Sequence, residues 1–274
     1  MRSFLLSVVM VAALSASVAQ AADLPDLPIL RGGYTDGLSS GRVNWQGFYF
    51  GGQGGFGTSD LNFTGATRTI AAHLLSNTAE EAAGGISQWP VGGKVSVHGH
   101  GFGAFAGYNS QWDNVVIGLD FSYMHGTFGG SQTDSLSRLF VDGNGNTDNL
   151  TYQSIAAIRV SDLGTLRARA GYAWGVFLPY AFGGVALGQA DIIRTANIFG
   201  TETSPPPASV TRNVFVTATD SQNSRLVYGY TAGLGVDVML ISCLFLRAEW
   251  EYVRLTTSID TNINTFKAGL GYKF

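Results

Sequence analysis

The alternation of apolar and polar side chains constrains this chain most, and it is clearest in the last ten residues. Every second position from Phe266 to Phe274 is apolar, while threonine, lysine and glycine fill the positions between. Successive side chains of a β-strand point to opposite faces, so this pattern predicts a strand. A final strand with one apolar face suits a membrane barrel, which closes by pairing its last strand with its first. The alternative for this segment alone is the edge strand of a soluble sandwich.

Composition favours the membrane barrel. Charged residues make up 13% of the chain and aromatic residues 12%, and 37 of the 274 residues are glycine. Typical soluble domains contain about 25% charged residues. After residue 22 no stretch is long and apolar enough for a membrane-spanning helix. No basic stripe indicates a nucleic-acid partner, and we expect none.

The first 21 residues have the pattern of a secretory signal peptide. Arg2 precedes an uncharged apolar run from Phe4 to Ala19, and Ala19-Gln20-Ala21 matches a cleavage site. We therefore expect export and a mature chain that begins at Ala22. Residues 22–44, rich in glycine and proline, are predicted to be a flexible periplasmic segment. The single cysteine, Cys243, excludes an internal disulfide and is interpreted as a small apolar residue beside a turn.

From residue 45 the chain is predicted to form an all-β fold, an eight-stranded antiparallel transmembrane barrel over residues 45–274 with long extracellular loops. The expected strands cover about 46–63, 98–111, 115–128, 151–174, 178–196, 224–239, 244–257 and 264–274. Long loops are expected at 64–97, 129–150 and 198–223, the first with a short helix within 69–82. Tight turns are expected after the second, fourth and sixth strands. This alternation is typical of outer-membrane barrels, with the chain ends in the periplasm.

The face opposite the apolar one carries charges on several strands. An eight-stranded barrel is just wide enough for side chains to fill it. We therefore predict a packed polar lumen instead of a wide channel, with Gly101, Gly103, Gly269 and Gly271 making room for long arginines. The fourth strand is expected to keep one parity throughout; the alternative is a turn at residues 162–164 that divides it into two strands. The predicted lumen network is Asp120, Arg159, Arg167, Arg169, Asp237, Arg247, Glu249, Glu251 and Lys267.

Aromatic residues gather toward the ends of the apolar faces. Rings with a polar edge favour the headgroup level of a bilayer, so we expect them to form interface girdles. The alternative is that they are core aromatics of a soluble sandwich. They are Tyr123, Tyr172, Trp250, Tyr252, Tyr272 and Phe274.

Several segments resemble the small outer-membrane β-barrel proteins of alphaproteobacteria, the "twenty-five and thirty-one kilodalton" outer-membrane proteins and their haemin-binding relatives. The resemblance implies an eight-stranded barrel in a Gram-negative outer membrane. It also implies that Tyr272 and Phe274 look like the recognition signal of the barrel-assembly machinery. The segments are 45–52, 107–109 with Gln111, 166–172, 180–186, 247–252 and 267–274.

Two patterns raise the question of a ligand. His98, His100 and His125 are expected near one rim, where imidazoles can bind a metal or haem iron; the alternative is polar residues near headgroups. Residues 142–148 resemble the start of a calcium loop, but Thr147 stands where the glycine belongs, so a surface turn is favoured. We predict no cofactor.

No hydrolase, nucleotide-binding or metalloprotease motif occurs, and we expect no enzyme. The favoured function is a structural envelope protein that presents its loops at the surface, with lipopolysaccharide and the assembly machinery as partners. The alternatives are a haem- or metal-binding surface protein and a narrow-channel porin.

Overall fold

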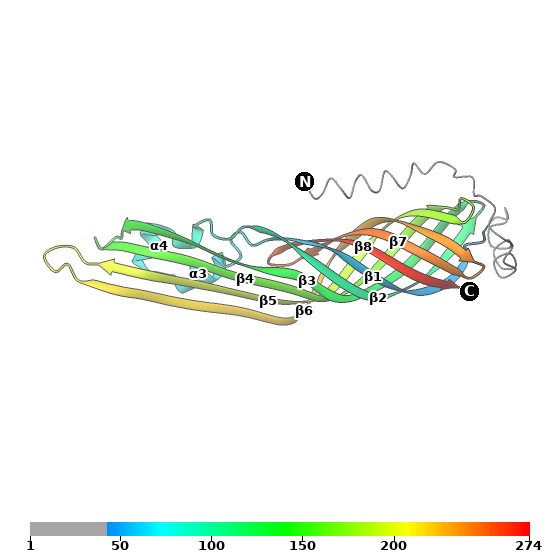
Figure 1. The fold of residues 1–274 in the computed structure, drawn as a ribbon. Helices are drawn as coiled ribbons and strands as arrows, with labels where there is room; N and C mark the ends of the chain where they lie inside the picture. The colour runs from blue at the N-terminus through cyan, green and yellow to red at the C-terminus, as the bar shows by residue number, and fades with distance from the viewer. Residues whose placement is uncertain (1–42) are drawn as a thin grey trace, which may run out of the picture. The chain divides into compact units, whose positions relative to one another are not determined.

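The computed structural model describes residues 43–274, so the expected signal peptide and nearly all of the expected periplasmic segment lie outside the described residues. The described chain contains eight antiparallel strands that close into a barrel in sequence order (Figure 1). β1 pairs with β8, and Tyr49 lies opposite Lys273. The predicted all-β, eight-stranded barrel is therefore confirmed. The strands are β1 (Gly47–Asn62), β2 (Lys94–Trp112), β3 (Val115–Val141), β4 (Thr147–Tyr172), β5 (Phe177–Thr203), β6 (Thr211–Ile241), β7 (Leu244–Thr256) and β8 (Asp260–Lys273).

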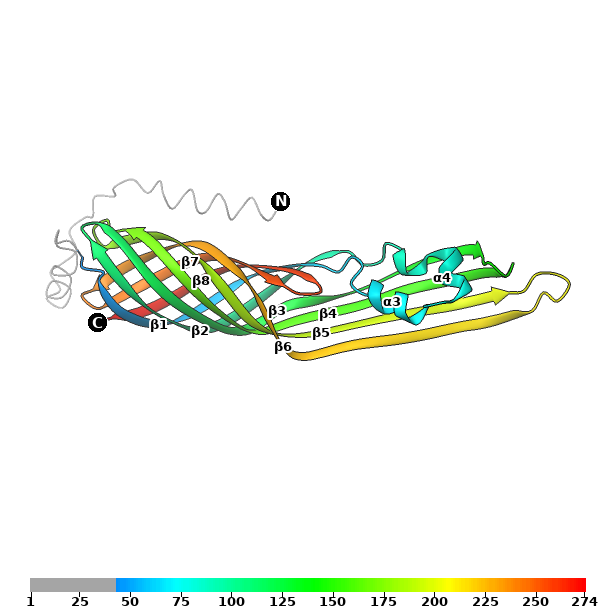
Figure 2. The same cartoon turned by 180° about the vertical axis from the view of Figure 1, so that it is seen from behind.

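Four strands continue far beyond the barrel and form a sheet that we call the extension. It contains residues 128–141 of β3, 147–160 of β4, 190–203 of β5 and 211–225 of β6 (Figures 1 and 2). The long loops predicted at 129–150 and 198–223 are thus wrong, because only residues 142–146 and 204–210 connect the strands. Polar residues in these stretches alternate with apolar ones, and their backbone groups pair across the sheet as readily as those of apolar strands.

The connection between β1 and β2 remains long, as expected. It contains α3 (Arg68–Leu74), α4 (Ala79–Gly84) and the 3-10 turn η1 (Ile86–Gln88). Apolar side chains from these elements pack on one face of the extension against Leu150, Tyr152 and Ile198. No helix among residues 43–274 is long and apolar enough to cross a membrane.

A β-bulge in β4 changes which face its side chains occupy. The register shifts between Val160 and Asp162, so Ile158 is buried on one side of the bulge, whereas Leu166, of the same parity, is exposed on the other. A bulge inserts one extra residue and reverses the alternation beyond it. The prediction of a constant parity was wrong. The placement of Arg159 in the lumen was wrong for the same reason, because this side chain is exposed on the outer surface.

Candidate functional site: the filled lumen and the extension

A layer of charged side chains crosses the middle of the barrel. It holds four acids and four bases, all nearly excluded from solvent. They project inward from β3, β4, β6, β7 and β8, because each has the parity opposite to the exposed apolar face of its strand. The members of this charged layer are Asp120, Arg167, Arg169, Asp237, Arg247, Glu249, Glu251 and Lys267.

The bases of the charged layer bridge acids on different strands. Arg247 donates from Nη1 to Asp120 Oδ2 at 2.9 Å and from Nε to Asp237 Oδ1 at 2.9 Å. Arg167 pairs with Asp120 and donates to Glu249 Oε2 at 2.9 Å. Charges buried this deeply are tolerated only when they are paired and hydrogen-bonded.

The remaining bases complete the layer. Arg169 Nη1 lies 2.9 Å from Asp237 Oδ2, and Lys267 pairs with Glu251. Every acid of the charged layer therefore has at least one basic partner. Four acids and four bases leave the layer without net charge, which is closer to balance than the prediction that included Arg159.

Aromatic side chains fill the lumen on the side of the short turns. Tyr49 donates its hydroxyl to Asp120 Oδ2 at 2.6 Å, and Tyr180 donates to Glu249 Oε1 at 2.7 Å. Arginine side chains stack on the rings, with the guanidinium of Arg247 4.1 Å from the centroid of Phe105. We call this group the aromatic layer: Trp45, Tyr49, Phe105, Tyr180, Phe182 and Phe245.

An apolar group fills the lumen on the other side of the charged layer, toward the extension. Its side chains are almost fully buried, and they pack as one cluster. The charges of the lumen are therefore confined to its middle layer, and mainly apolar groups lie on both sides of it. We call this group the aliphatic layer: Leu61, Phe63, Met124, Phe128, Leu163, Val227, Val253, Leu255, Ile259 and Ile263.

Two of the inward glycines, Gly269 and Gly271, make room for aromatic rings instead of arginines. A Cβ on Gly271 would lie 2.3 Å from the Phe245 ring, and one on Gly269 would lie 3.0 Å from the Phe105 ring. A Cβ on Gly101 would crowd Met124. The expectation that these glycines accommodate the arginines directly was thus wrong. The aromatic rings have inward parity in the sequence, so the alternation could have revealed them.

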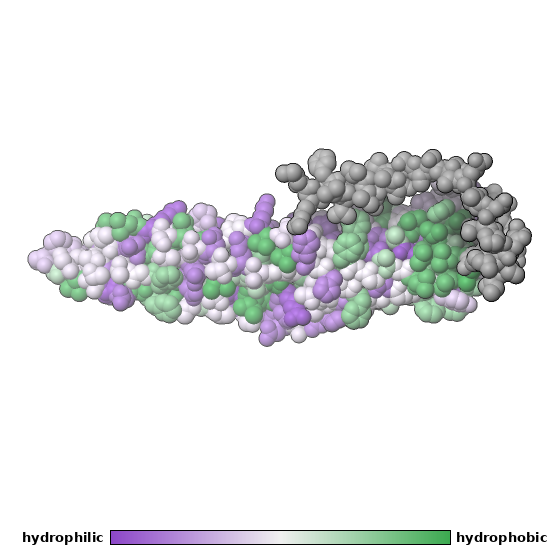
Figure 3. All heavy atoms as spheres, viewed as in Figure 1, coloured by the Kyte–Doolittle hydropathy of each residue, from purple (hydrophilic) through white to green (hydrophobic). Residues whose placement is uncertain are grey.

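The outer surface of the barrel is apolar. Phe48, Leu119 and Leu166 are each more than half exposed, and Figure 3 shows hydrophobic residues gathered on the barrel but mixed with polar ones on the extension. Most of the predicted girdle residues also have exposed side chains: Tyr123, Tyr172, Trp250, Tyr272 and Phe274. Tyr252 is partly exposed. Exposed rings beside an aliphatic band are typical of a surface that faces lipid.

The three histidines lie on the outer surface of β2 and β3 without forming a metal site. His98, His100 and His125 are all exposed. His125 Nδ1 lies 2.8 Å from Asp162 Oδ1, which also accepts a hydrogen bond from Tyr123 at 2.6 Å. Among the described residues no three His, Cys, Asp or Glu side chains are arranged as a ligand set for a metal.

The calcium-like segment forms a turn between β3 and β4. The carboxylate of Asp142 accepts hydrogen bonds from the backbone amides of Asn144 at 2.9 Å and Asn146 at 2.8 Å. Its oxygens are thus engaged by the turn itself, as in other Asx turns.

Asp148 is the most unusual charged group of the extension. It is fully buried, neither carboxylate oxygen has a hydrogen-bond partner among the described residues, and Glu202 lies directly opposite on β5. Burial, together with the negative charges of Asp142, Glu202 and Glu80 nearby, raises the pKa of Asp148 to about 6. Below that pH the buried group is neutral.

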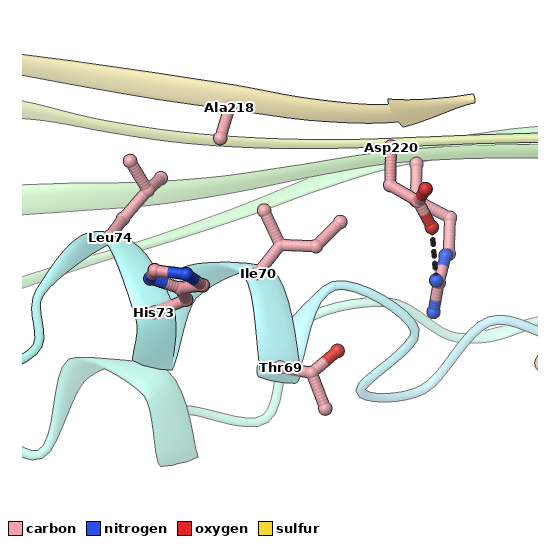
Figure 4. Close-up of a pocket in the computed structure, with 7 residues that line it drawn as sticks. Thr69, Ile70, His73, Leu74, Ala218 and Asp220 are labelled. Carbon is pink, nitrogen blue, oxygen red and sulfur yellow. Dashed lines mark hydrogen bonds and ion pairs between the residues drawn. The ribbon is translucent and has the colours of Figure 1, made fainter.

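A groove runs between α3 and the β5–β6 hairpin. It has a volume of about 520 Å³ and is lined by Ile70, His73 and Leu74 of α3 and by Ala218 of β6, with the ion pair of Arg194 and Asp220 at one end. In Figure 4 the side chains of Ile70 and Leu74 point toward the strands, and the small side chain of Ala218 projects toward them. These three side chains form the apolar part of an open groove beside the outermost strand of the extension, and Thr69 also lines it.

Comparisons with known proteins agree with this architecture. A family model described as the outer membrane protein β-barrel domain matches residues 6–274. A 25 kDa outer-membrane immunogenic protein of Brucella ovis is 27% identical over 172 residues, which cover 63% of this chain and 62% of the relative. A 22 kDa outer membrane protein of Rhizobium leguminosarum bv. viciae is 24% identical over 243 residues, covering 84% and 79%.

The matched stretch therefore spans less than two thirds of the length of the Brucella protein. Among solved structures, the attachment invasion locus protein Ail of Yersinia pestis aligns with a TM-score of 0.39 and 13% identity, over 84% of this chain and 99% of Ail.

Proposed function

Because the chain belongs to the outer membrane protein β-barrel family, we propose that it is a structural protein of the outer membrane that strengthens the envelope and displays the extension at the cell surface. The barrel serves as a lipid-facing anchor in this proposal. The extension serves as the exposed part, because it lies on the side opposite the short turns and the C-terminus.

The observation that carries the proposal is the sealed lumen. The aromatic, charged and aliphatic layers lie in series, so a solute would have to displace all three. Displacing one partner of a buried ion pair costs about 3–5 kcal/mol, and the charged layer contains several such pairs. This disfavours a channel and supports an anchoring role.

The exposed histidines offer little support for a haem or metal site. Their rings lie on the barrel exterior, and the imidazole of His125 already contacts Asp162. We expect contacts with lipopolysaccharide around the barrel. We also expect the assembly machinery to recognise Tyr272 and Phe274, whose rings lie beside Phe50 on the lipid-facing side.

The test compares a strain that lacks the protein with strains that carry either the full chain or a barrel whose β3–β4 and β5–β6 hairpins are cut short. Loss of the protein should increase sensitivity to detergent and chelator, and both versions should restore resistance. In planar bilayers the refolded full chain should produce no regular current steps. Frequent large steps, or unchanged detergent resistance in the strain without the protein, would contradict the proposal.

A further inference from the structure

One edge of the extension is left open. β7 begins to pair with β6 only at Tyr228, and among the described residues no strand pairs with the free side of residues 211–222, which we call the β6 edge. The other edge of the extension is contacted at two positions, because the backbone amides of Gly92 and Gly93 donate hydrogen bonds to the side-chain oxygens of Asp134 and Gln132 of β3. The β6 edge thus keeps a row of unpaired backbone groups.

The β6 edge lacks the sequence features that usually prevent an exposed strand from pairing with another chain. Edges are commonly blunted by proline, by charges or by a bulge. Residues 211–222 contain no proline, and their charges are confined to Arg212 and Asp220, with the stretch Val214–Thr219 uncharged between them. The register with β5 is unbroken from Thr211 to Gln222. The edge is therefore long, regular and rich in β-branched residues.

Symmetry limits how two copies of this edge can pair. In a two-fold interface the same surface meets itself. In a parallel ladder, the hydrogen-bonded residues of the two strands are offset by one position. A two-fold rotation relates identical residues and cannot produce this offset. Identical edges that meet around a two-fold axis must therefore run antiparallel. An antiparallel pair centred on Val216 brings together residues equally distant from it. Arg212, which pairs with Glu202 in its own chain, then faces Asp220 of the second copy, which pairs with Arg194 of that copy, at both ends of the pair.

The groove beside α3 gives a second, independent reason to centre the antiparallel pair on Val216. Val214 and Val216 pack against the apolar cluster beneath α3, and Ala218 leaves the groove open. In the pair centred on Val216, Val214 of the second copy lies opposite Ala218. Cross-strand partners share one face of a sheet. The second copy would therefore place its valine at the mouth of the groove that Ile70 and Leu74 line (Figure 4).

We propose that the β6 edge binds the β6 edge of a second copy of this chain, antiparallel and centred on Val216, and so joins two facing membranes. The extension strands continue away from the barrel (Figure 2), so antiparallel copies have their barrels at opposite ends of the dimer. This inference rests on the proposed display of the extension at the surface, but it does not depend on whether the lumen conducts.

The first test is disulfide cross-linking of the refolded full chain after Cys243→Ser removes the native thiol. Val216→Cys should form a linked dimer with itself under mild oxidation, since the two residues face each other across the axis. Asn213→Cys and Thr219→Cys should link to each other when mixed and should not link to themselves, because identical residues are then roughly 20 Å apart. Equal self-linking of all three variants, or no linking of any, would overturn the proposal.

The second test blocks the interface. Val216→Lys places two like charges on the axis and should abolish both the dimer measured by sedimentation and the clumping of cells that display the protein. Asn213→Lys, which faces Thr219 away from the axis, should retain both. Each variant is first checked for the gel shift of a folded barrel. A wild-type protein that stays monomeric, or one that binds an extended peptide of other sequence but not itself, would refute homotypic pairing while leaving the envelope role intact.

Discussion

At the scale of single residues, the buried charges stabilise the barrel only as a set. Arg247 contacts both Asp120 and Asp237, so losing this one side chain leaves two carboxylates with fewer partners. A single uncompensated buried charge costs about 3–5 kcal/mol. The outward Arg159, by contrast, has water as an alternative partner.

We therefore predict that Arg247→Met lowers the free energy of unfolding by about 3–5 kcal/mol. Arg159→Met should change it by no more than about 0.5 kcal/mol, as is usual for surface sites. The measurement is urea unfolding of the refolded protein, followed by the gel shift between folded and unfolded forms. Equal effects of the two substitutions would show that the charged layer does not control stability.

Asp148 gives a prediction about pH. Its pKa is raised to about 6 in the folded protein from an ordinary value of 3.8, so the folded state is weakened as pH rises through this window and the loss is complete above it. Asp148→Asn removes the charge. At pH 8 the Asp148→Asn substitution should slow hydrogen exchange of the β3–β4 hairpin about tenfold. This corresponds to ~1.4 kcal/mol, which is only part of the free energy that the pKa shift of Asp148 represents. At pH 3 the effect should vanish.

Asp142→Asn is the matched control in the same hairpin. Although burial raises the pKa of Asp142, hydrogen bonds from Asn146 and Asn144 lower it overall. A lowered pKa means that the carboxylate stabilises the fold above the ordinary pKa, so this substitution should speed exchange at pH 8. If both substitutions change exchange in the same direction, the assigned electrostatics of the turn are wrong.

At the scale of elements, the alternation of side chains predicted every strand of the barrel but not the lengths of those that leave it. In the barrel, one face of each strand must be apolar and the other must pack in the lumen, so the alternation of side chains is strict. In the extension, both faces of β6 near Phe215 and Thr217 meet water or a thin covering, and polar residues are tolerated. Glycine, asparagine, aspartate and serine suggested a loop at 129–150, and three consecutive prolines suggested one at 198–223, although only residues 142–146 and 204–210 connect the strands.

The β4 bulge was not predicted from the sequence, because the residues around it do not reveal which face they occupy. Ser161, Asp162 and Gly164 are compatible with either parity, and nothing local records an extra residue. The charged layer was predictable because Arg167, Arg169, Arg247, Glu249 and Glu251 interrupt strands that are otherwise apolar. The aliphatic layer was not predicted, although Met124 and Leu163 have the same inward parity in the sequence as Asp120 and Arg167.

The helices between β1 and β2 cover the extension, which leads to a third prediction. Thr67 beside α3 contacts the Tyr152 hydroxyl at 2.6 Å and donates to Ser154 at 2.8 Å. Replacing residues 66–91 with a glycine–serine linker of equal length should expose Leu150, Tyr152 and Ile198. Limited proteolysis should then cut the extension about tenfold faster, while the barrel keeps its gel shift because its strands remain paired on both sides. Unchanged proteolysis would mean that the helices do not stabilise the extension.

At the scale of the whole molecule, the barrel and the extension differ in how their strand edges are paired. The barrel has no free edge, and its lumen is filled by the three layers of side chains. The extension has two edges: the β1–β2 connection contacts side chains on the β3 edge, and no described strand pairs with the β6 edge. In the proposed arrangement, the closed barrel is the membrane anchor, and it carries a sheet whose outermost strand is open at the cell surface.

The three lumen layers in series predict how the barrel responds when one of them is opened. Phe105→Ala with Phe245→Ala creates space in the aromatic layer, but the charged and aliphatic layers still close the bore. Val253→Ser with Leu255→Ser loosens the aliphatic layer alone, and the aromatic rings remain.

Each double variant should therefore give no regular current steps in a planar bilayer, whereas the combined variant, with Glu251→Gln and Lys267→Met added, should conduct. Only fractions that keep the gel shift of a folded barrel are compared. Conduction by either double variant would mean that one layer alone closes the lumen, and the anchoring role would then depend on that layer instead of on the whole filled barrel.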